Sequence, residues 1–145
     1  MIARCASPDE PGWRELRAAL WPDCADEDHD RDTVAYCSSA RYAAFIARDA
    51  ANRALGFVEV SLRSDYVNGT STSPVGFIEG LYVIPEARMQ GVARSLVRAA
   101  EDWARDKGCS EMASDTPLEN EGSQAMHRAL GYADGDRVVY FRKDL

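Results

Sequence analysis

The most constraining feature of this chain is an apolar run that leads into a turn containing a glycine. Residues 77–83 read FIEGLYV, and the turn RMQGVA follows at residues 88–93. Gly91 and Ala93 leave the turn's backbone uncovered, so several N–H groups can face one ligand at the positive end of the following helix. The segment predicts a diphosphate-binding turn, and the alternative is an ordinary strand-to-helix connection with two small residues for packing.

Length and composition indicate one compact globular domain. The chain has 145 residues, 46% of them hydrophobic and 28% charged, which is enough to bury a real core. No stretch approaches the roughly 20 apolar residues that cross a bilayer. The first residues lack the basic-then-apolar layout of a secretion signal. We therefore expect a single cytoplasmic domain over residues 1–145, without a membrane partner.

The cysteines and histidines do not indicate a metal site. Cys5, Cys24, Cys37 and Cys109 are scattered with no Cys-x-x-Cys pair, and the two histidines share no ligand spacing. We expect buried or idle thiols, no disulfide framework and no metal.

The charge of the chain restricts its partners. The formal net charge is −7, so nucleic acid is a poor partner because phosphate contacts need a basic face. An acidic surface attracts cations instead. The acidic run at residues 26–32 is typical of a solvated helix start, and it would add to a field that attracts a polycation.

Hydrophobic periodicity predicts an alternation of strands and helices. Ser7 is expected to be the N-cap of a first helix, with Glu10 completing a capping box and Pro22 ending the helix. Alternating side chains predict a pair of neighbouring strands at residues 42–48 and 54–64, which are joined near Asn52. The expected elements are strands at 1–6, 42–48, 54–64, 75–83 and 111–115, helices from about 7, at 30–39, 89–107 and 120–130, a loop at 65–74 and a β-rich tail at 132–142. This order is that of a mixed α/β domain.

Two motifs carry a resemblance to a known family. The strand, turn and helix of residues 77–107 form the first, and Asn120 followed by a helix and Leu130-Gly131-Tyr132 forms the second. The pattern resembles the GCN5-related N-acetyltransferase superfamily. That resemblance implies a central mixed, mostly antiparallel sheet with helices on both faces.

Four further segments resemble the short, single-domain aminoglycoside 6′-N-acetyltransferases. They are LWP at 20–22, DYVNG at 65–69, FIEG at 77–80 and EMASDT at 111–116. The resemblance implies acetyl-CoA as donor, direct attack by the 6′-amine of an aminoglycoside antibiotic, a role in resistance, and a homodimer.

The resemblance also implies which residues bind the coenzyme. Backbone groups of Leu81, Tyr82 and Val83 would pair with the pantetheine arm, as an added strand would. Asn120 would contact the coenzyme, act as a helix N-cap, or do both. The N–H groups that would bind the pyrophosphate belong to Met89, Gln90, Gly91, Val92, Ala93 and Arg94.

Acidic residues are expected at the acceptor site, because the acceptor is a polycation. Glu79 lies inside an apolar strand, where an unpaired carboxylate is costly. It either forms an ion pair with an arginine across the sheet, or binds the substrate ammonium and helps to remove its proton through water. Asp115 ends the next strand and either binds substrate or caps the following turn. Asp136 matches a third acidic position of the family, or is part of a turn.

Two aromatic residues and one histidine complete the expected site. By resemblance, Trp21 and Tyr66 line the antibiotic, although a core position is the alternative for Trp21. Many members of the superfamily place a tyrosine seven residues after the asparagine to protonate the leaving thiolate, and here that position is His127. His127 is either that acid or a structural histidine, so the general acid stays unassigned.

Two other functions compete with this interpretation. The same fold can acetylate a polyamine, or an amine on a peptide or protein. A domain that binds acyl-CoA without catalysis is the second alternative. A dinucleotide-binding fold is excluded, because no Gly-x-Gly-x-x-Gly follows the first strand.

Overall fold

The computed structural model describes residues 1–145 and contains one five-stranded sheet. Its strand order is β1-β2-β3-β4-β5, with antiparallel pairs throughout except for the parallel pair of β4 and β5. The elements are β1 Ile2–Arg4, α1 Trp13–Leu20, α2 Asp26–Ser38, β2 Tyr42–Arg48, β3 Ala54–Arg63, β4 Val75–Val83, the 3-10 turn η1 Pro85–Ala87, α3 Val92–Asp106, β5 Met112–Ser114 and α4 Glu121–Ala129. The expected mixed, mostly antiparallel sheet is confirmed.

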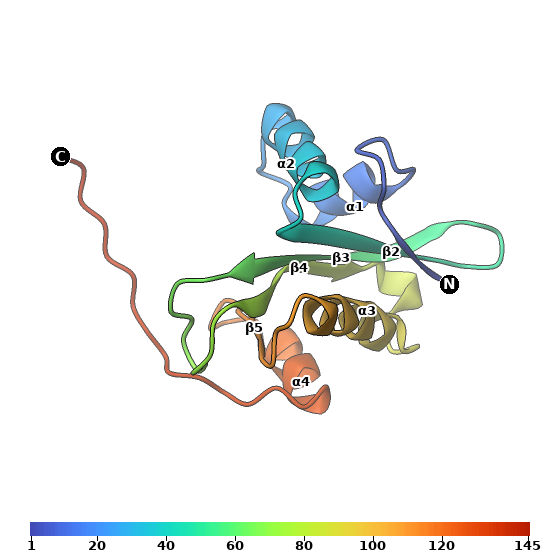
Figure 1. Ribbon diagram of the computed structural model, residues 1–145. Coiled ribbons are helices and arrows are strands. Elements are labelled where there is room, and N and C mark those ends of the chain that lie inside the picture. Colours follow the sequence, from blue (N-terminus) through green and yellow to red (C-terminus); the bar gives the residue numbers. More distant parts are fainter.

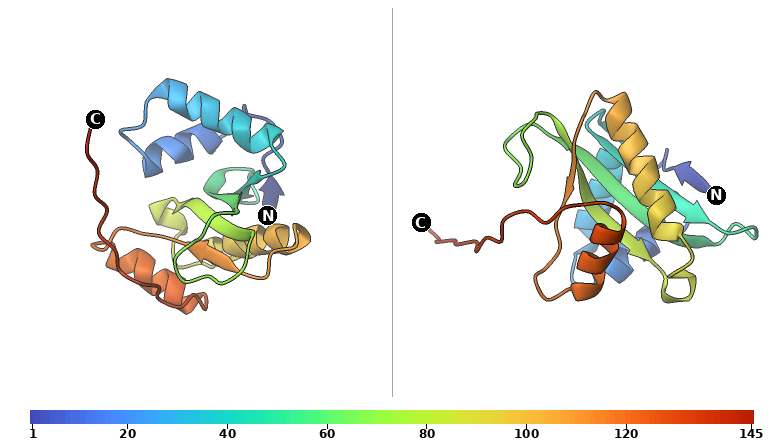
Figure 2. Two further views of the ribbon diagram at one scale, coloured as in Figure 1. Left: turned by 60° about the vertical axis from the view of Figure 1, so that its left-hand side comes forward. Right: turned by 90° about the horizontal axis from the view of Figure 1, so that it is seen from below.

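Helices cover both faces of the sheet. Figure 1 and the left view of Figure 2 show α1 and α2 on one side, and α3 and α4 on the other. Neighbouring side chains in the middle of β3 point to opposite faces of the sheet, as the sequence pattern predicts. Val58 and Val60 pack against the apolar stripe of α3, whereas Phe57 packs with Trp13 and Leu16 of α1.

Two irregularities shape the centre of the sheet. The register passes from Glu59 opposite Gly80 to Val60 opposite Ile78, which leaves Glu79 as the extra residue of a β-bulge. Strand β5 pairs with β4 only as far as Ile78. Beyond that point, one edge of β4 has no strand neighbour.

The first two helices differ from the sequence prediction. Helix α1 begins at Trp13 with Gly12 as N-cap, so the prediction of Ser7 as N-cap is wrong. The Ser7 hydroxyl accepts the N–H of Asp9, two residues away, in a local turn. Glu10 forms an ion pair with Arg48 in place of a capping box. Helix α2 begins at Asp26, four residues earlier than expected, because three acids favour its positive N-terminal end.

The β structure predicted for the tail at residues 132–142 does not form. No strand follows α4, and the tail runs away from the body of the molecule in Figure 1. Its side chains have strand propensity, but an extended segment is stabilised only where another strand accepts its hydrogen bonds. The apolar side chains of residues 138–141 are consequently exposed.

Candidate active site

A run of unpaired main-chain N–H groups lies between β4 and α3. The six N–H groups from Met89 to Arg94 donate no hydrogen bond within the chain. Gly91, the N-cap of α3, has a left-handed φ of 83° and no side chain to cover these groups. The first turn of α3 contains no acid, whereas that of α2 contains three. The turn is therefore suited to bind an anion.

Arg88 fixes this turn to the end of β4. Its Nε donates to the carbonyl oxygen of Val83 at 2.8 Å. Its guanidinium carbon lies 5.5 Å from the centre of the Tyr82 ring. These contacts place the unpaired N–H groups next to the last residues of the strand.

The open edge of β4 offers a second set of main-chain groups. Leu81, Tyr82 and Val83 pair with β3 on one side. On the other side they have no strand neighbour, because β5 has already left the sheet. An extended ligand with amide groups can add to this edge as a further strand would.

The bulge directs the Glu79 carboxylate to the face that carries α1 and α2. Its Oε1 accepts hydrogen bonds from Ser61 Oγ at 2.6 Å and from Arg63 Nε at 3.1 Å and Nη2 at 3.0 Å. Its Oε2 accepts one hydrogen bond, from Arg63 Nη2 at 2.9 Å. The cross-sheet arginine pair considered from the sequence is therefore present. Because a carboxylate oxygen has two lone pairs, Oε2 keeps an acceptor position.

Trp21 packs over the backbone next to this bulge. A Cβ atom added to Gly80 would lie 2.4 Å from the Trp21 ring, so only glycine fits beneath it. The ring also meets Phe57 edge to face, with 6.0 Å between centroids. Trp21 is only partly buried, so it combines the core contact with an accessible surface beside Glu79.

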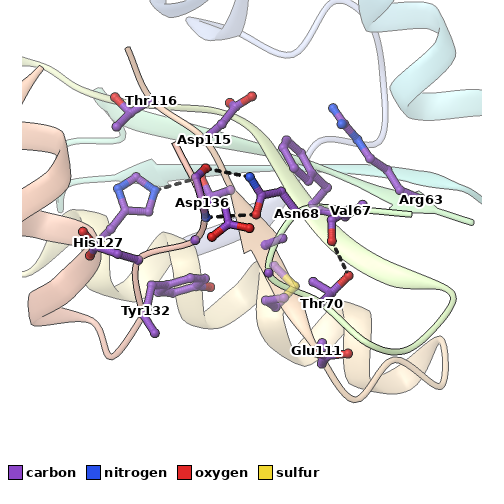
Figure 3. Close-up of a pocket in the computed structure, with 18 of the residues that line it drawn as sticks. Arg63, Val67, Asn68, Thr70, Glu111, Asp115, Thr116, His127, Tyr132 and Asp136 are labelled. Carbon is purple, nitrogen blue, oxygen red and sulfur yellow. Dashed lines mark hydrogen bonds between the residues drawn. The ribbon is translucent and has the colours of Figure 1, made fainter. Parts of the chain in front are cut away.

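A broad cavity of about 1830 Å³ lies between the 65–70 loop, β5, α4 and the start of the tail. Tyr66, Asp115 and Asp136 all line it. Tyr66 is 81% exposed, and the exposed Asp115 carboxylate has no ion-pair partner, hydrogen bond or capping contact. Figure 3 shows Asp115, Asp136 and His127 around this cavity. Glu79 and Trp21 do not line it, but Arg63, the partner of Glu79, does.

Asn68 holds the tail at one wall of this cavity. The dashed lines in Figure 3 include its two hydrogen bonds to the main chain of Asp136. Two residues earlier, Asp134 accepts two hydrogen bonds from Arg128, both at 2.8 Å. Asp136 itself is thus held by the 65–70 loop, whereas Arg128 of α4 holds the tail two residues earlier.

His127 ties α4 to β5. Its Nδ1 lies 2.7 Å from the carbonyl oxygen of Ser123, which can only accept, so Nδ1 carries a proton. Its Nε2 lies 2.8 Å from Ser114 Oγ, within hydrogen-bond distance. Both nitrogens are engaged within the protein, which favours the structural alternative for this residue. Asn120 is the N-cap of α4, since its Oδ1 accepts the N–H of Ser123 at 3.0 Å.

Three residues that shape the site are not predicted from the sequence. Arg63 lies on the same face of β3 as Ser61, but its contact with Glu79 depends on a register that only the bulge defines. Asn68 lies in the DYVNG segment, whose resemblance implies a role for Tyr66 but none for Asn68. Ser114 precedes Asp115 and gave no signal of its bond to His127.

No group of three or more His, Cys, Asp or Glu side chains is placed to hold a metal ion. No helix combines the length and the apolar character that crossing a membrane requires.

An open strand edge that leads to a helix start with unpaired N–H groups can hold a ligand that carries both amide groups and a diphosphate, as the acyl-CoA donor of an acyl-group transferase does. The chain belongs to the acetyltransferase (GNAT) family, whose pattern matches residues 11–132. It is 45% identical to the aminoglycoside N(6′)-acetyltransferase type 1 of Serratia marcescens over 145 residues, which are 100% of this chain and 99% of the relative. It is 46% identical to the enzyme of the same name from Stenotrophomonas maltophilia, with 99% of this chain and 93% of the relative covered.

Solved structures agree with this placement. The structure of AAC(6′)-Iy in complex with the bisubstrate analog CoA-S-monomethyl-acetylneamine has a TM-score of 0.96 and 42% identity, covering 100% of this chain and 98% of that one. The structure of AAC(6′)-Ih from Acinetobacter baumannii has a TM-score of 0.93 and 41% identity, with the same coverage.

Proposed function

We propose that this protein transfers an acetyl group from acetyl-CoA to the 6′-amine of aminoglycoside antibiotics and thereby confers resistance. Full-length relatives carry this activity in their names, and one solved relative holds a bisubstrate analog of CoA and an acetylated aminoglycoside. The observation that carries the proposal is the six unpaired N–H groups at the end of an open strand edge, next to the Glu79 bulge.

The donor end of the site fits a CoA thioester. The N–H groups of Met89 to Arg94 would bind the diphosphate. The open edge at Leu81, Tyr82 and Val83 would pair with the amides of the pantetheine arm, and Asn120 would contact the coenzyme from the end of α4. Acetyl-CoA itself supplies an activated acyl group.

The acceptor end fits a cationic amino-sugar. Asp115 and Asp136 would bind ammonium groups of the antibiotic from the cavity. Trp21 and Tyr66 would pack against sugar rings, and Tyr66 would also donate a hydrogen bond. The net charge of −7 favours the approach of such a cation.

Glu79 is the residue that we propose for catalysis. Its Oε2 would accept a hydrogen bond from the substrate ammonium and, through water, take a proton from it. The neutral amine then attacks the thioester carbonyl, and a C–N bond forms. The C–S bond breaks, and the proton that the nitrogen still has to lose passes through water to the departing thiolate, which leaves the acetamide and the free thiol of CoA. Free N–H groups of β4 would stabilise the oxygen that becomes negative during the attack.

A thiol-release assay with acetyl-CoA and a panel of amines tests this function. Initial rates should be highest with kanamycin-type antibiotics and lower with spermidine and peptide amines, and NMR of the product should show acetylation at the 6′-nitrogen. Highest rates on spermidine or on a peptide would contradict the antibiotic assignment. Calorimetric binding of acetyl-CoA without turnover of any amine would indicate a non-catalytic binding domain.

We propose further that the protein is a homodimer joined through its tail. Val138, Val139, Tyr140 and Phe141 are 59%, 76%, 88% and 93% exposed, an unusual state for four consecutive apolar residues. The outer edge of β5 also has no strand neighbour. Light scattering should give twice the chain mass, and truncation after Asp136 should halve it. A monomeric full-length chain would disprove the dimer.

Finally, we propose that residues 1–145 act as one catalytic domain in the cytoplasm. All four cysteines are free thiols, which suits a reducing compartment. Cell fractionation with an immunoblot tests the location. Limited proteolysis that releases a stable, active fragment would contradict a single domain.

A further inference from the structure

A buried ion pair links α1 to the centre of the sheet. Arg17 of α1 is 2% exposed and Glu59 of β3 is 1% exposed. Arg17 Nη1 donates to Glu59 Oε1, which also accepts the indole N–H of Trp13 at 3.0 Å. Arg17 donates further to His29 Nδ1 at 3.1 Å and to Asp32 Oδ2 at 2.9 Å. All three nitrogens of the guanidinium therefore donate hydrogen bonds within the protein.

This fixed guanidinium also contacts Trp21. Its central carbon lies 4.9 Å from the centre of the Trp21 ring, within cation–π range. The two residues are one helical turn apart, and the main-chain N–H of Trp21 donates a hydrogen bond to the carbonyl oxygen of Arg17 at 2.8 Å. The ring rests in turn on Gly80, the residue directly opposite Glu59 in the sheet.

We propose that Arg17 and Glu59 are positioning residues that hold the Trp21 ring beside Glu79 and so set the affinity for the acceptor. The contacts form a closed circuit from Glu59 through Arg17, Trp21 and Gly80 back to Glu59. The consequence for substrate binding rests on the proposed function, since Trp21 matters to the acceptor only if an amino-sugar binds beside Glu79.

Stability alone does not explain this pair. Replacing a buried ion pair by apolar side chains of similar volume is often neutral or stabilising, because two charges no longer have to be desolvated. The structural role of the ion pair itself could therefore be filled by Met and Leu, at the cost of the hydrogen bonds with Trp13, His29 and Asp32. A methionine at position 17 would not provide a cation over the Trp21 ring.

The test uses the full chain with the double substitution Arg17→Met and Glu59→Leu. The matched control is the double substitution Arg48→Met and Glu10→Leu. It removes another ion pair between the α1 region and the sheet, with side chains 7% and 23% exposed, that does not contact Trp21. Both double variants should stay folded by circular dichroism.

The first readout is the position of Trp21 itself, which needs no substrate. In ¹H–¹⁵N spectra the Trp21 indole resonance, assigned with Trp21→Phe, should shift or broaden in the Arg17/Glu59 variant and stay in place in the Arg48/Glu10 variant. The Trp103 indole, whose buried Nε1 has no hydrogen-bond partner, is the internal reference. An unchanged Trp21 resonance in the Arg17/Glu59 variant would overturn the proposal.

The second readout separates acceptor from donor. The KM for a kanamycin-type antibiotic should rise about tenfold in the Arg17/Glu59 variant, as the loss of a desolvated cation–π contact implies. The Kd for acetyl-CoA should be unchanged, and the control variant should change neither. Equal losses for donor and acceptor, or an unchanged KM, would contradict the positioning role.

The two proposals fail in different ways. If the wild-type protein acetylates no aminoglycoside, the proposed function is wrong, and the NMR readout still decides whether the pair holds Trp21. If the Arg17/Glu59 variant does not fold, Glu59→Gln replaces it. Glutamine keeps the shape of the Glu59 side chain and an acceptor for Arg17 but removes the negative charge. We expect the same shift of the Trp21 resonance and the same rise in KM, both of smaller size.

Discussion

Asn68 holds Asp136 through both main-chain polar groups of that residue. The Asn68 Nδ2 donates to the Asp136 carbonyl oxygen at 2.7 Å, and the Asn68 Oδ1 accepts the Asp136 N–H at 3.1 Å. One side chain thus gives the tail the pairing that a neighbouring strand would provide. This connection joins the loop that carries Tyr66 to the third acidic residue of the proposed acceptor site.

Asn68→Ala is therefore expected to release Asp136 from the cavity. Losing hydrogen bonds worth about 1 kcal/mol should raise the KM for a kanamycin-type antibiotic about fivefold, with the Kd for acetyl-CoA unchanged. Arg128→Met is the control, because it breaks the exposed pair with Asp134 but leaves the Asn68 contacts. Steady-state kinetics check both variants, and a KM that stays at the wild-type value in Asn68→Ala would refute the role of this contact.

Glu79→Gln should lower turnover far more than it lowers coenzyme affinity. The amide cannot take a proton from the substrate ammonium, so kcat should fall about 100-fold, the size of a lost general base. The Kd for acetyl-CoA, measured by calorimetry, should stay near the wild-type value. Glu111→Gln is the control, since this carboxylate lines the cavity that Arg63 also lines, but it accepts hydrogen bonds from Ser71 and Thr72. Equal losses of coenzyme binding and turnover in Glu79→Gln would contradict the assignment.

The sequence predicts much of this fold because local pattern and tertiary packing agree in the central elements. From Phe57 onwards strand β3 alternates, and Phe57 does face a different layer of helices from Val58 and Val60. The turn at residues 88–93 is predicted to open a helix that runs from about residue 89 to 107, and the observed α3 begins at Val92 with Gly91 as its N-cap. The turn signal and the periodic apolar stripe of α3 are both local, so no partner has to be known.

The errors occur where the outcome depends on distant partners. The local sequence predicts that Glu10 completes a capping box, but the buried Arg48 forms an ion pair with its carboxylate. The tail has strand-forming side chains, but no strand edge of the same chain accepts it. The contact of Glu79 with Arg63 depends on which residue the bulge displaces, and no local pattern fixes that register.

Gly91→Ala should weaken acetyl-CoA binding without crowding the protein. A Cβ at Gly91 meets no protein atom within 4 Å, so its effects are backbone strain at a φ of 83° and obstruction of the N–H groups. Gly108→Ala is a close control, since Gly108 follows the same helix with a φ of 87° and equally open surroundings. Each variant should lose about 1 kcal/mol of unfolding free energy, but only Gly91→Ala should raise the Kd for acetyl-CoA. Equal Kd values for the two variants in calorimetry would exclude this turn as the phosphate site.

The buried Glu59 should make stability depend on pH in a characteristic direction. Burial raises the pKa of Glu59 from 4.5 to about 7, although Arg17 beside it and the hydrogen bond from Trp13 act to lower it. Between these two pKa values the folded protein binds a proton that the unfolded chain does not. The contribution of Glu59 to the free energy of unfolding is thus fully present below about pH 4.5 and falls as pH rises through about 7.

Urea unfolding of the wild type and of Glu59→Gln at pH 5 and pH 8 measures this effect. From pH 5 to pH 8, Glu59→Gln should gain stability relative to the wild type by up to about 3 kcal/mol, since one pKa unit corresponds to about 1.4 kcal/mol. Glu86→Gln is the control, because the exposed Glu86 has a pKa lowered by its own backbone N–H and by Arg53. Because both its folded and unfolded pKa values lie at or below 4.5, its contribution is nearly constant from pH 5 to pH 8, and Glu86→Gln should leave the pH dependence in this range unchanged. A constant difference between wild type and Glu59→Gln across the range would mean that Glu59 stays charged in the folded protein throughout.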